Sequence, residues 1–272
     1  MFAVNLYTII GILIFLATLA AIMTRPYRIP EALASVIGAA LMLLGGYVHA
    51  HEVASLLLRE WNVYGFFLGL MAISALADQA GIFEMLAYQA GRWAQGSGLR
   101  LYLAVFLSGT LITAFLSNDA CALILTPVVY ALVTRLRLPV MPFMFACTFI
   151  ADTASFVFPV GNPINILVLN AFDGGLSTFF RYLLLPSLFC ISLNMALFLR
   201  LFRRDLRNRY DAADLPEVKL PNRQFFQFVA GALVLVAAAY VAAAALHFPL
   251  SIVALGGAGL LLAGSIVLSL FG

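Results

Sequence analysis

The sequence predicts an all-α, polytopic transmembrane helical bundle that contains a re-entrant hairpin and a broken helix. Three observations predict this fold: 64% of the residues are hydrophobic and only 10% are charged, long apolar stretches recur, and polar residues interrupt two of them. A soluble domain carries roughly 25% charged residues, so this composition indicates a protein embedded in a lipid membrane. A helix needs about 20 apolar residues to cross a hydrocarbon core of about 30 Å. The stretches expected to do so are 5–23, 31–48, 61–77, 142–169, 178–199, 225–246 and 250–271.

The placement of the basic residues predicts an orientation. Thirteen of the 15 basic residues fall in four groups: Arg25 with Arg28, Arg92 with Arg100, Arg135 with Arg137, and seven residues within 200–223. If the segment 101–134 begins and ends on one membrane face, all four groups lie on the same side, which the positive-inside bias makes cytoplasmic. The net charge of +3 is then a topology signal, and we expect no nucleic-acid partner. We expect the N-terminus outside and a cytoplasmic linker at 203–223.

The apolar segment 101–134 is too long for one helix, and Ser117, Asn118 and Asp119 interrupt it in the middle. The arms on either side have about sixteen and fifteen residues and reach only about 24 Å at 1.5 Å per residue. We therefore expect a re-entrant hairpin whose tip stops inside the membrane, which is tolerated only where protein or water surrounds the exposed backbone. Before it, 83–93 has the pattern of a helix lying in the membrane interface.

The stretch 142–169 is interrupted by Pro159, Gly161, Asn162 and Pro163. The prolines remove backbone donors and break the helix. The break leaves a helix N-terminus whose free N–H groups can hold an oxygen-bearing solute, and unwound carbonyls that can hold a cation or a proton donor. We expect Thr153, Ser155, Gly161, Asn162 and Asn165 to bind substrate or ion with Ser117, Asn118 and Asp119.

Asp119 and Asp152 are the acidic residues that lie well inside apolar stretches. An ionised aspartate at a helix centre costs roughly 2.5 to 3.5 kcal/mol on insertion scales, and such a cost implies a use. Because burial disfavours the charged carboxylate, we expect Asp119 and Asp152 to couple the site to protons. Ser117, Thr153 and Ser155 are also common helix-packing residues in membranes, so a purely structural role is their alternative.

The remaining candidate ligand residues, the cysteines and histidines, give weaker evidence for a binding site. Cys121 lies two residues beyond Asp119, but a cysteine in a membrane helix is usually a small packing residue. His49 and His51 beside Glu52 form only a weak metal pattern. The sequence contains no H-E-x-x-H motif and no Ser–His pair that would indicate an intramembrane enzyme. We expect no metal, no cofactor and no enzymatic activity.

The order of these motifs resembles the ArsB-type arsenite and antimonite efflux permeases of the ion-transporter superfamily. More distantly, it resembles the sodium/proton antiporters and dicarboxylate transporters of the same superfamily. The resemblance runs along the whole chain and rests on the segments 78–84, 92–93, 117–127, 150–155, 162–165 and 201–211. In that family Ala or Asn usually stands where this chain has Ser117.

The resemblance implies a secondary active transporter that exports neutral arsenite or antimonite across the inner membrane in exchange for protons. It also implies an elevator-like movement of the hairpin and broken helix against a scaffold. An ATPase subunit and a second copy of the chain are the protein partners that it leaves open. A sodium/proton antiporter is the nearest alternative, because an Asn–Asp pair at a tip also suits cation coordination. Organic-anion transport comes third, since a carboxylate substrate prefers cationic or neutral donors to two aspartates.

The family has inverted repeats, and the domain organisation follows from them. We expect an N-terminal span with the first transporter repeat in 1–202, the linker in 203–223 and the start of a second repeat in 224–272. A second polar-tipped hairpin and a second broken helix do not follow in the sequence. The expectation is therefore that the chain carries one of the two halves of such a site. An inactive half that needs a partner chain is a separate alternative.

Overall fold

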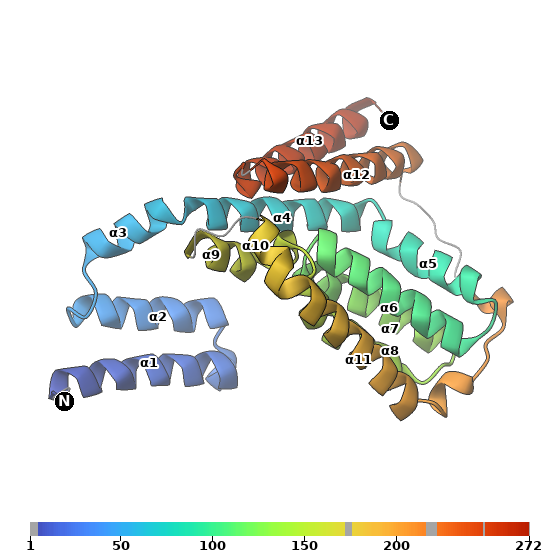
Figure 1. Ribbon diagram of the computed structural model, residues 1–272, viewed down its shortest axis with the longest axis horizontal. Coiled ribbons are helices and arrows are strands. Elements are labelled where there is room, and N and C mark those ends of the chain that lie inside the picture. Colours follow the sequence, from blue (N-terminus) through green and yellow to red (C-terminus); the bar gives the residue numbers. More distant parts are fainter. Residues whose placement is uncertain (1–4, 172–175, 216–221, 247, 272) are drawn as a thin grey trace. The chain divides into compact units, whose positions relative to one another are not determined.

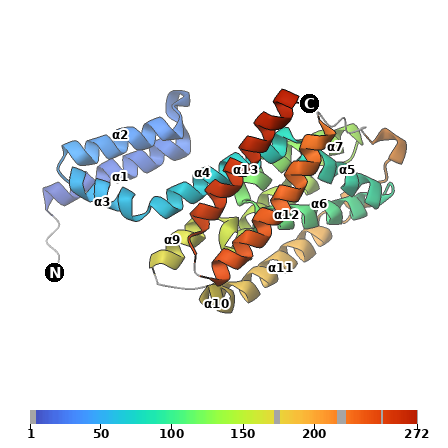
Figure 2. The same cartoon turned by 90° about the horizontal axis from the view of Figure 1, so that it is seen from above.

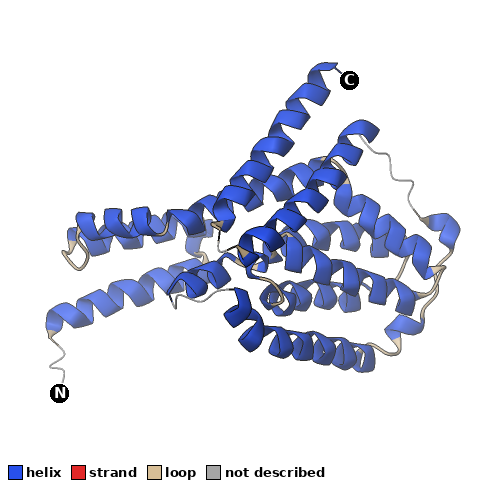
Figure 3. Ribbon diagram, turned by 45° about the horizontal axis from the view of Figure 1, so that its top comes forward, coloured by secondary structure: helices blue, strands red, loops and turns tan. Residues whose placement is uncertain are grey.

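A computed structural model describes residues 5–171, 176–215, 222–246 and 248–271 (Figure 1). These residues are almost entirely helical (Figure 3), and within them the structure has no strand apart from an isolated β-bridge between Ser97 and Arg209. The chain divides into two compact units, Met1–Trp61 and Asn62–Gly272, which are described separately. The predicted all-α polytopic bundle is confirmed.

The first unit contains α1 (Leu6–Thr24), α2 (Glu31–Leu44) and α3 (Ala50–Arg59). The helices α1 and α2 pack closely, and the rings of Tyr7 and Tyr47 stack with centroids 4.2 Å apart. The stretch 31–48 is shorter as a helix than expected: α2 has 14 residues, about 21 Å at 1.5 Å per residue, because the chain turns at Gly46 with φ +69°. The helix α3 was not predicted.

The second unit begins with α4 (Trp61–Gln79) and continues through the hairpin and the broken helix. Its other helices are α5 (Ile82–Ala94), α6 (Gly98–Phe115), α7 (Thr126–Arg135), α8 (Val140–Thr153), α9 (Pro163–Ala171), α10 (Leu176–Phe179), α11 (Leu185–Leu201), α12 (Arg223–Ala245) and α13 (Leu250–Phe271). The helices α12 and α13 lie side by side along most of their length (Figures 1 and 2). They pack on α4, where Phe66 meets the Tyr240 ring at 6.0 Å and Asn62 Oδ1 accepts a hydrogen bond from the Ser251 backbone N–H.

Helix α8 is the centre of the remaining helices, because α6, α7 and α11 all pack against it. Aromatic rings fill the contact with α11, and the Phe149 and Phe198 centroids are 5.0 Å apart. Within the described residues, six helical segments are long and apolar enough to cross a membrane. Five of them are α1, α4, α6, α12 and α13. The sixth is the continuous segment Leu176–Leu201, which includes α10 and α11. The chain is a multi-pass membrane protein.

The segment after α11, residues 205–215, packs against the helical bundle. Leu206 and Tyr210 are both buried, at 3% and 8% exposure. The Tyr210 hydroxyl donates a hydrogen bond to the Gly91 carbonyl at 2.6 Å, and its backbone N–H donates to Gly96 at 3.0 Å. Burial raises the pKa of Tyr210 above its ordinary value. Residues 216–221, which include Pro216 and Pro221 of the expected linker, lie outside the described residues.

Both ends of the predicted hairpin meet this docked segment. At the start of α6, the Gly98 backbone N–H donates to the Asn208 carbonyl at 3.0 Å. At the end of α7, Arg135 Nε donates to the Asp214 carbonyl at 3.2 Å. The segment 98–135 therefore leaves and returns to one end of the bundle, as expected. Its first arm is longer than expected, since α6 has 18 residues, about 27 Å.

The close approach at Gly98 predicts a stability effect. A β-carbon on Gly98 would lie 2.7 Å from the Asn208 carbonyl oxygen and 3.2 Å from that of Leu206, and backbone atoms cannot rotate away. We expect Gly98→Ala to lower the free energy of unfolding by about 1 to 3 kcal/mol, the usual cost of overpacking. Thermal unfolding in detergent measures it.

Gly231→Ala is the matched control, because Gly231 is a helical glycine with nothing within 4 Å of the added carbon. Alanine favours a helix interior over glycine, so this variant should be as stable as the parent or slightly more so. Equal melting of the two variants would contradict the docking of residues 205–215 on the hairpin.

Candidate functional site

The hairpin tip is held by its own side chains. After α6 ends at Phe115, Ser117 Oγ accepts a hydrogen bond from the Ala120 backbone N–H at 3.0 Å, and Asn118 Oδ1 accepts from the Asp119 N–H at 3.0 Å. Ser117 thus caps the return arm in the manner of a helix N-cap. Asn118 and Asp119 occupy the first turn of that arm, where the partial positive charge of the helix favours a carboxylate.

The return arm starts as a π-helical turn, Ala120–Leu125, before α7. The wide turn is stabilised by Thr126, whose hydroxyl and backbone N–H both donate to the Cys121 carbonyl. Pro127 follows and supplies no backbone donor. Such π-helical turns are frequent at functional sites. The sequence contains no signal for the π-helical geometry.

The broken helix is an unwound segment between α8 and α9. Two 3₁₀ turns, Ala154–Phe156 and Pro159–Gly161, are separated by an extended backbone at Phe158, and Asn162 is extended again before α9 begins. Asn162 Oδ1 accepts from the Ile164 N–H at 3.0 Å and so caps the new helix. The predicted break is present at the predicted residues.

The Asn165 side chain stabilises the unwound segment by hydrogen bonds to its backbone. Its side-chain Nδ2 donates to the carbonyl of Ser155 at 2.8 Å and to that of Phe158 at 3.4 Å, and the residue is 4% exposed. The Phe158 carbonyl also accepts from the Gly161 N–H at 3.0 Å, so Asn165 matters most for the Ser155 carbonyl. A carbonyl without a donor inside a membrane costs several kcal/mol. The Ser155 hydroxyl donates in turn to the Asp152 carbonyl at 2.6 Å. Asn165 Oδ1 has no hydrogen bond among the described residues.

The tip and the break pack on each other through α6. The Phe115 and Phe158 rings are 5.8 Å apart, and a β-carbon on Gly161 would lie 2.9 Å from the Thr113 carbonyl and 2.7 Å from that of Ser155. Beside them the Cys121 thiol donates to the Cys147 carbonyl at 3.6 Å, which joins the return arm to α8. The end of α6, two residues before Ser117, therefore packs on the unwound segment.

Two expected site residues face elsewhere. Thr153 donates to the Phe149 carbonyl at 2.7 Å and accepts from Asn194 of α11 at 3.3 Å, so its hydroxyl is used in packing. The Asp152 side chain is exposed on the surface of the chain, whereas Asp119 is half-buried. Sequence reasoning missed Phe115, Phe158 and the fully buried Thr113, since an apolar stretch gives no signal for which of its members join two elements.

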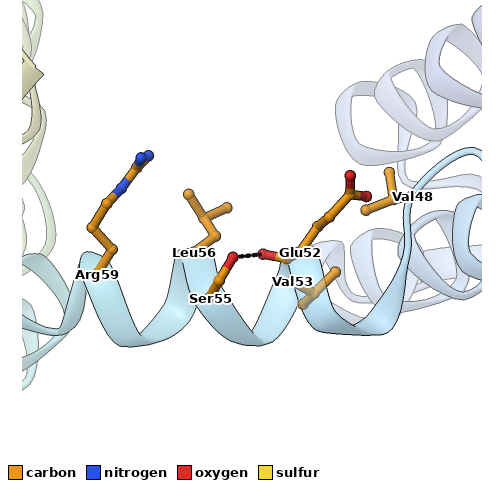
Figure 4. Close-up of a pocket in the computed structure, with 6 residues that line it drawn as sticks. All are labelled: Val48, Glu52, Val53, Ser55, Leu56 and Arg59. Atoms are coloured by element: carbon orange, nitrogen blue, oxygen red, sulfur yellow. Dashed lines mark hydrogen bonds between the residues drawn. The ribbon is translucent and has the colours of Figure 1, made fainter.

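Two pockets are lined by residues other than those of the tip and the break. One, of about 460 Å³, runs along α3 and is lined by Val48, Glu52, Val53, Ser55, Leu56 and Arg59 (Figure 4). There the His49 backbone N–H donates to Glu52 and lowers the pKa of that carboxyl. The other is lined by Tyr88, Arg92, Gln95 and Leu215. Within the described residues no three His, Cys, Asp or Glu side chains cluster as a metal site.

Apolar helices, a hairpin with a polar tip and a helix unwound beside it together define a polytopic membrane protein of the transporter type. The chain belongs to the citrate transporter family (CitMHS), whose model matches residues 13–269.

Relatives of known sequence agree with this family. The chain is 30% identical to an arsenical pump membrane protein of Escherichia coli, over 92% of this chain and 59% of the relative. It is 32% identical to an arsenical pump membrane protein of Yersinia enterocolitica, over 82% and 53%. It is 27% identical to an uncharacterized transporter of Mycobacterium tuberculosis, over 94% and 60%. The chain thus spans little more than half the length of these relatives. The resemblance to ArsB-type permeases is confirmed.

The role of Asn165 yields a prediction. Asn165→Leu keeps a similar volume but removes the side-chain donor of the Ser155 carbonyl, at about 1 to 3 kcal/mol for the unsatisfied group. The Phe158 carbonyl keeps its bond from the Gly161 N–H. We expect a clear fall in the unfolding free energy, measured by thermal or denaturant unfolding in micelles.

Asn194→Leu serves as the control. It removes one long hydrogen bond to a Thr153 hydroxyl that keeps its own acceptor, the Phe149 carbonyl, so its effect should be distinctly smaller. If both variants lower the unfolding free energy equally, the Asn165 hydrogen bonds do not stabilise the unwound segment.

Proposed function

We propose that this chain forms part of a secondary active transporter that exports arsenite or antimonite across the inner membrane in exchange for protons. The observation that carries the proposal is a capped, polar hairpin tip with a half-buried Asp119, which follows directly on the end of α6 that packs against the unwound helix. The names of the E. coli and Y. enterocolitica relatives support the choice of substrate.

The groups at the tip and the break suit a small neutral solute. The segments 115–126 and 150–165 contain no lysine, arginine or histidine, so the available partners are hydroxyls, amides and backbone groups. Neutral arsenite is a compact molecule with three hydroxyls, which both donate and accept hydrogen bonds. In our proposal Ser117 and Asn118 bind it from the tip, while Asn165 Oδ1 and the Asn162 end of α9 bind it from the break.

Asp119 is the proposed main proton carrier. Its carboxylate lies in the first turn of the return arm and is half-buried. In our proposal a movement of the tip opens this carboxylate to one side of the membrane and then to the other, and so couples proton flow to the substrate site. Asp152 is proposed as a second proton group, and its exposed carboxylate is open to partners outside this chain. Thr153, Ser155 and Gly161 complete the proposed set as supports of the unwound backbone.

The proposed orientation follows from the arginines. Arg92, Arg100, Arg135 and the arginines of residues 203–209 belong to the end of the second unit where the linker docks. The positive-inside bias makes this end cytoplasmic. The same bias, applied to Arg25 and Arg28 at the end of α1, makes the N-terminus external. The hairpin then enters the membrane from the cytoplasm.

Organic-anion export is a second candidate, favoured by the description of the family as citrate transporters. A citrate-like substrate carries several negative charges and would lie close to the Asp119 carboxylate, with no basic side chain in the tip or break segments to compensate. Like charges at short range disfavour each other, so we place this candidate after arsenite. A sodium/proton antiporter is the third candidate.

Transport by everted membrane vesicles that contain the chain tests the proposal. We expect arsenite uptake that depends on an imposed pH gradient and no sodium-dependent collapse of that gradient. Asp119→Asn should abolish the proton dependence, because an amide cannot carry the proton. Asp205→Asn, a half-buried aspartate of the docked linker, should retain it. Citrate uptake or sodium-driven proton movement in place of arsenite uptake would overturn the proposal.

A further inference from the structure

A pocket of about 360 Å³ lies between the C-terminal turn of α5 and the docked linker. Its walls are Tyr88, Arg92 and Gln95 on one side and Leu215 on the other. Only a glycine at position 91 allows Leu215 to pack this closely on α5, because a β-carbon on Gly91 would lie 2.4 Å from Leu215 Cδ2. The pocket therefore exists where the linker and α5 come together, and it is separate from the hairpin tip and the break.

The pocket offers hydrogen-bond donors without an acidic partner. The Arg92 guanidinium carbon lies 5.9 Å from the centroid of the Tyr88 ring, and the side chain is exposed. Among the described residues, the ion pairs within 4.0 Å are Arg25–Glu31 and Arg59–Glu60, so Arg92 is in neither. Gln95 uses Oε1 to accept from Arg100 at 3.3 Å, which turns its amide N–H groups to other partners. A guanidinium, an amide and a phenol are donors suited to a phosphate.

The charge around the pocket is positive. Arginines outnumber aspartates in the last turn of α5, the start of α6 and the described linker residues 203–215; the residues are Arg92, Arg100, Arg203, Arg204, Arg207 and Arg209 against Asp205, Asp211 and Asp214. Asp211 is engaged, since Oδ1 accepts from the Ala213 N–H at 2.9 Å. A further arginine, Arg135, donates a hydrogen bond to the backbone carbonyl of Asp214 and so lies at the linker as well. An anion at this place meets a net attractive field.

The surface beside the pocket is that of a membrane interface. Trp93 is 59% exposed and Leu99 is 43% exposed, and both adjoin the arginines in sequence. An aromatic and an aliphatic side chain next to basic residues is the pattern that lies at the headgroup level of a bilayer. This points to a phosphate that is attached to a lipid rather than to a free anion.

We propose that the pocket formed by Tyr88, Arg92, Gln95 and Leu215 binds the phosphate of an anionic phospholipid headgroup. Arg92 provides the bidentate, charged donor, Gln95 and Tyr88 provide neutral donors, and Trp93 lies beside the acyl chains. Because Leu215 belongs to the linker, a bound headgroup also joins the linker to α5. The inference needs only that the chain is embedded in a membrane, and it is independent of the transported substrate.

Lipid binding to the purified chain in detergent tests the proposal, with native mass spectrometry as the readout. Dioleoyl phosphatidylglycerol is the probe and dioleoyl phosphatidylcholine the comparison. A basic residue near a membrane surface contributes about 1 kcal/mol to the attraction of anionic lipid, so we expect Arg92→Gln to weaken phosphatidylglycerol binding about fivefold. Phosphatidylcholine binding should not change.

Arg181→Gln is the matched control, because Arg181 lies over Tyr182 at the same 5.9 Å but lines neither described pocket. It should bind phosphatidylglycerol like the parent. Comparing each variant with and without lipid separates lipid binding from any stability change at the end of α5. Unchanged binding by Arg92→Gln, or equal binding of the two lipids by the parent, would overturn the proposal. Full competition by inorganic phosphate would overturn the assignment to a lipid.

Discussion

Inside a bilayer every backbone polar group needs a partner from the protein, and this constraint governs the second unit. The chain leaves helical geometry at the hairpin tip and at the break, and in both places nearby side chains satisfy the freed groups. Ser117 caps the return arm, Asn162 caps α9, and Asn165 bonds the two carbonyls of the unwound segment. The polar residues that interrupt the apolar sequence are therefore the ones that make the interruptions stable.

The rest of the unit positions these two interruptions. Helix α6 brings the tip to the break, and α8 supplies a surface for α6, α7 and α11. At the other end of the hairpin, the linker holds the start of α6 through Gly98 and the end of α7 through Arg135. The linker is thus hydrogen-bonded to both ends of the hairpin. The proposed headgroup site lies where this linker meets α5.

Much of this architecture could be predicted from the sequence, because its signals are local. Pro159 and Pro163 necessarily interrupt hydrogen bonding, and a polar triplet in an apolar segment too long for one span implies a turn. The docking of Tyr210 on Gly91 could not be predicted, since it joins backbone and side chain 119 residues apart. The same holds for Asp152, whose exposure depends on which face of α8 its neighbours cover, and for the π-helical turn after Asp119.

The central claim is that residues 98–135 form a hairpin with both ends on the linker side of the membrane. The most direct test is labelling of single cysteines with a membrane-impermeant maleimide in sealed vesicles, in a Cys190→Ser background that removes the exposed native thiol. Leu99→Cys, Arg137→Cys and Arg209→Cys place reporters at the two ends and on the linker. We expect all three to react from the same side. Reaction of Arg137→Cys from the side opposite to Leu99→Cys would contradict the hairpin and the site built on its tip.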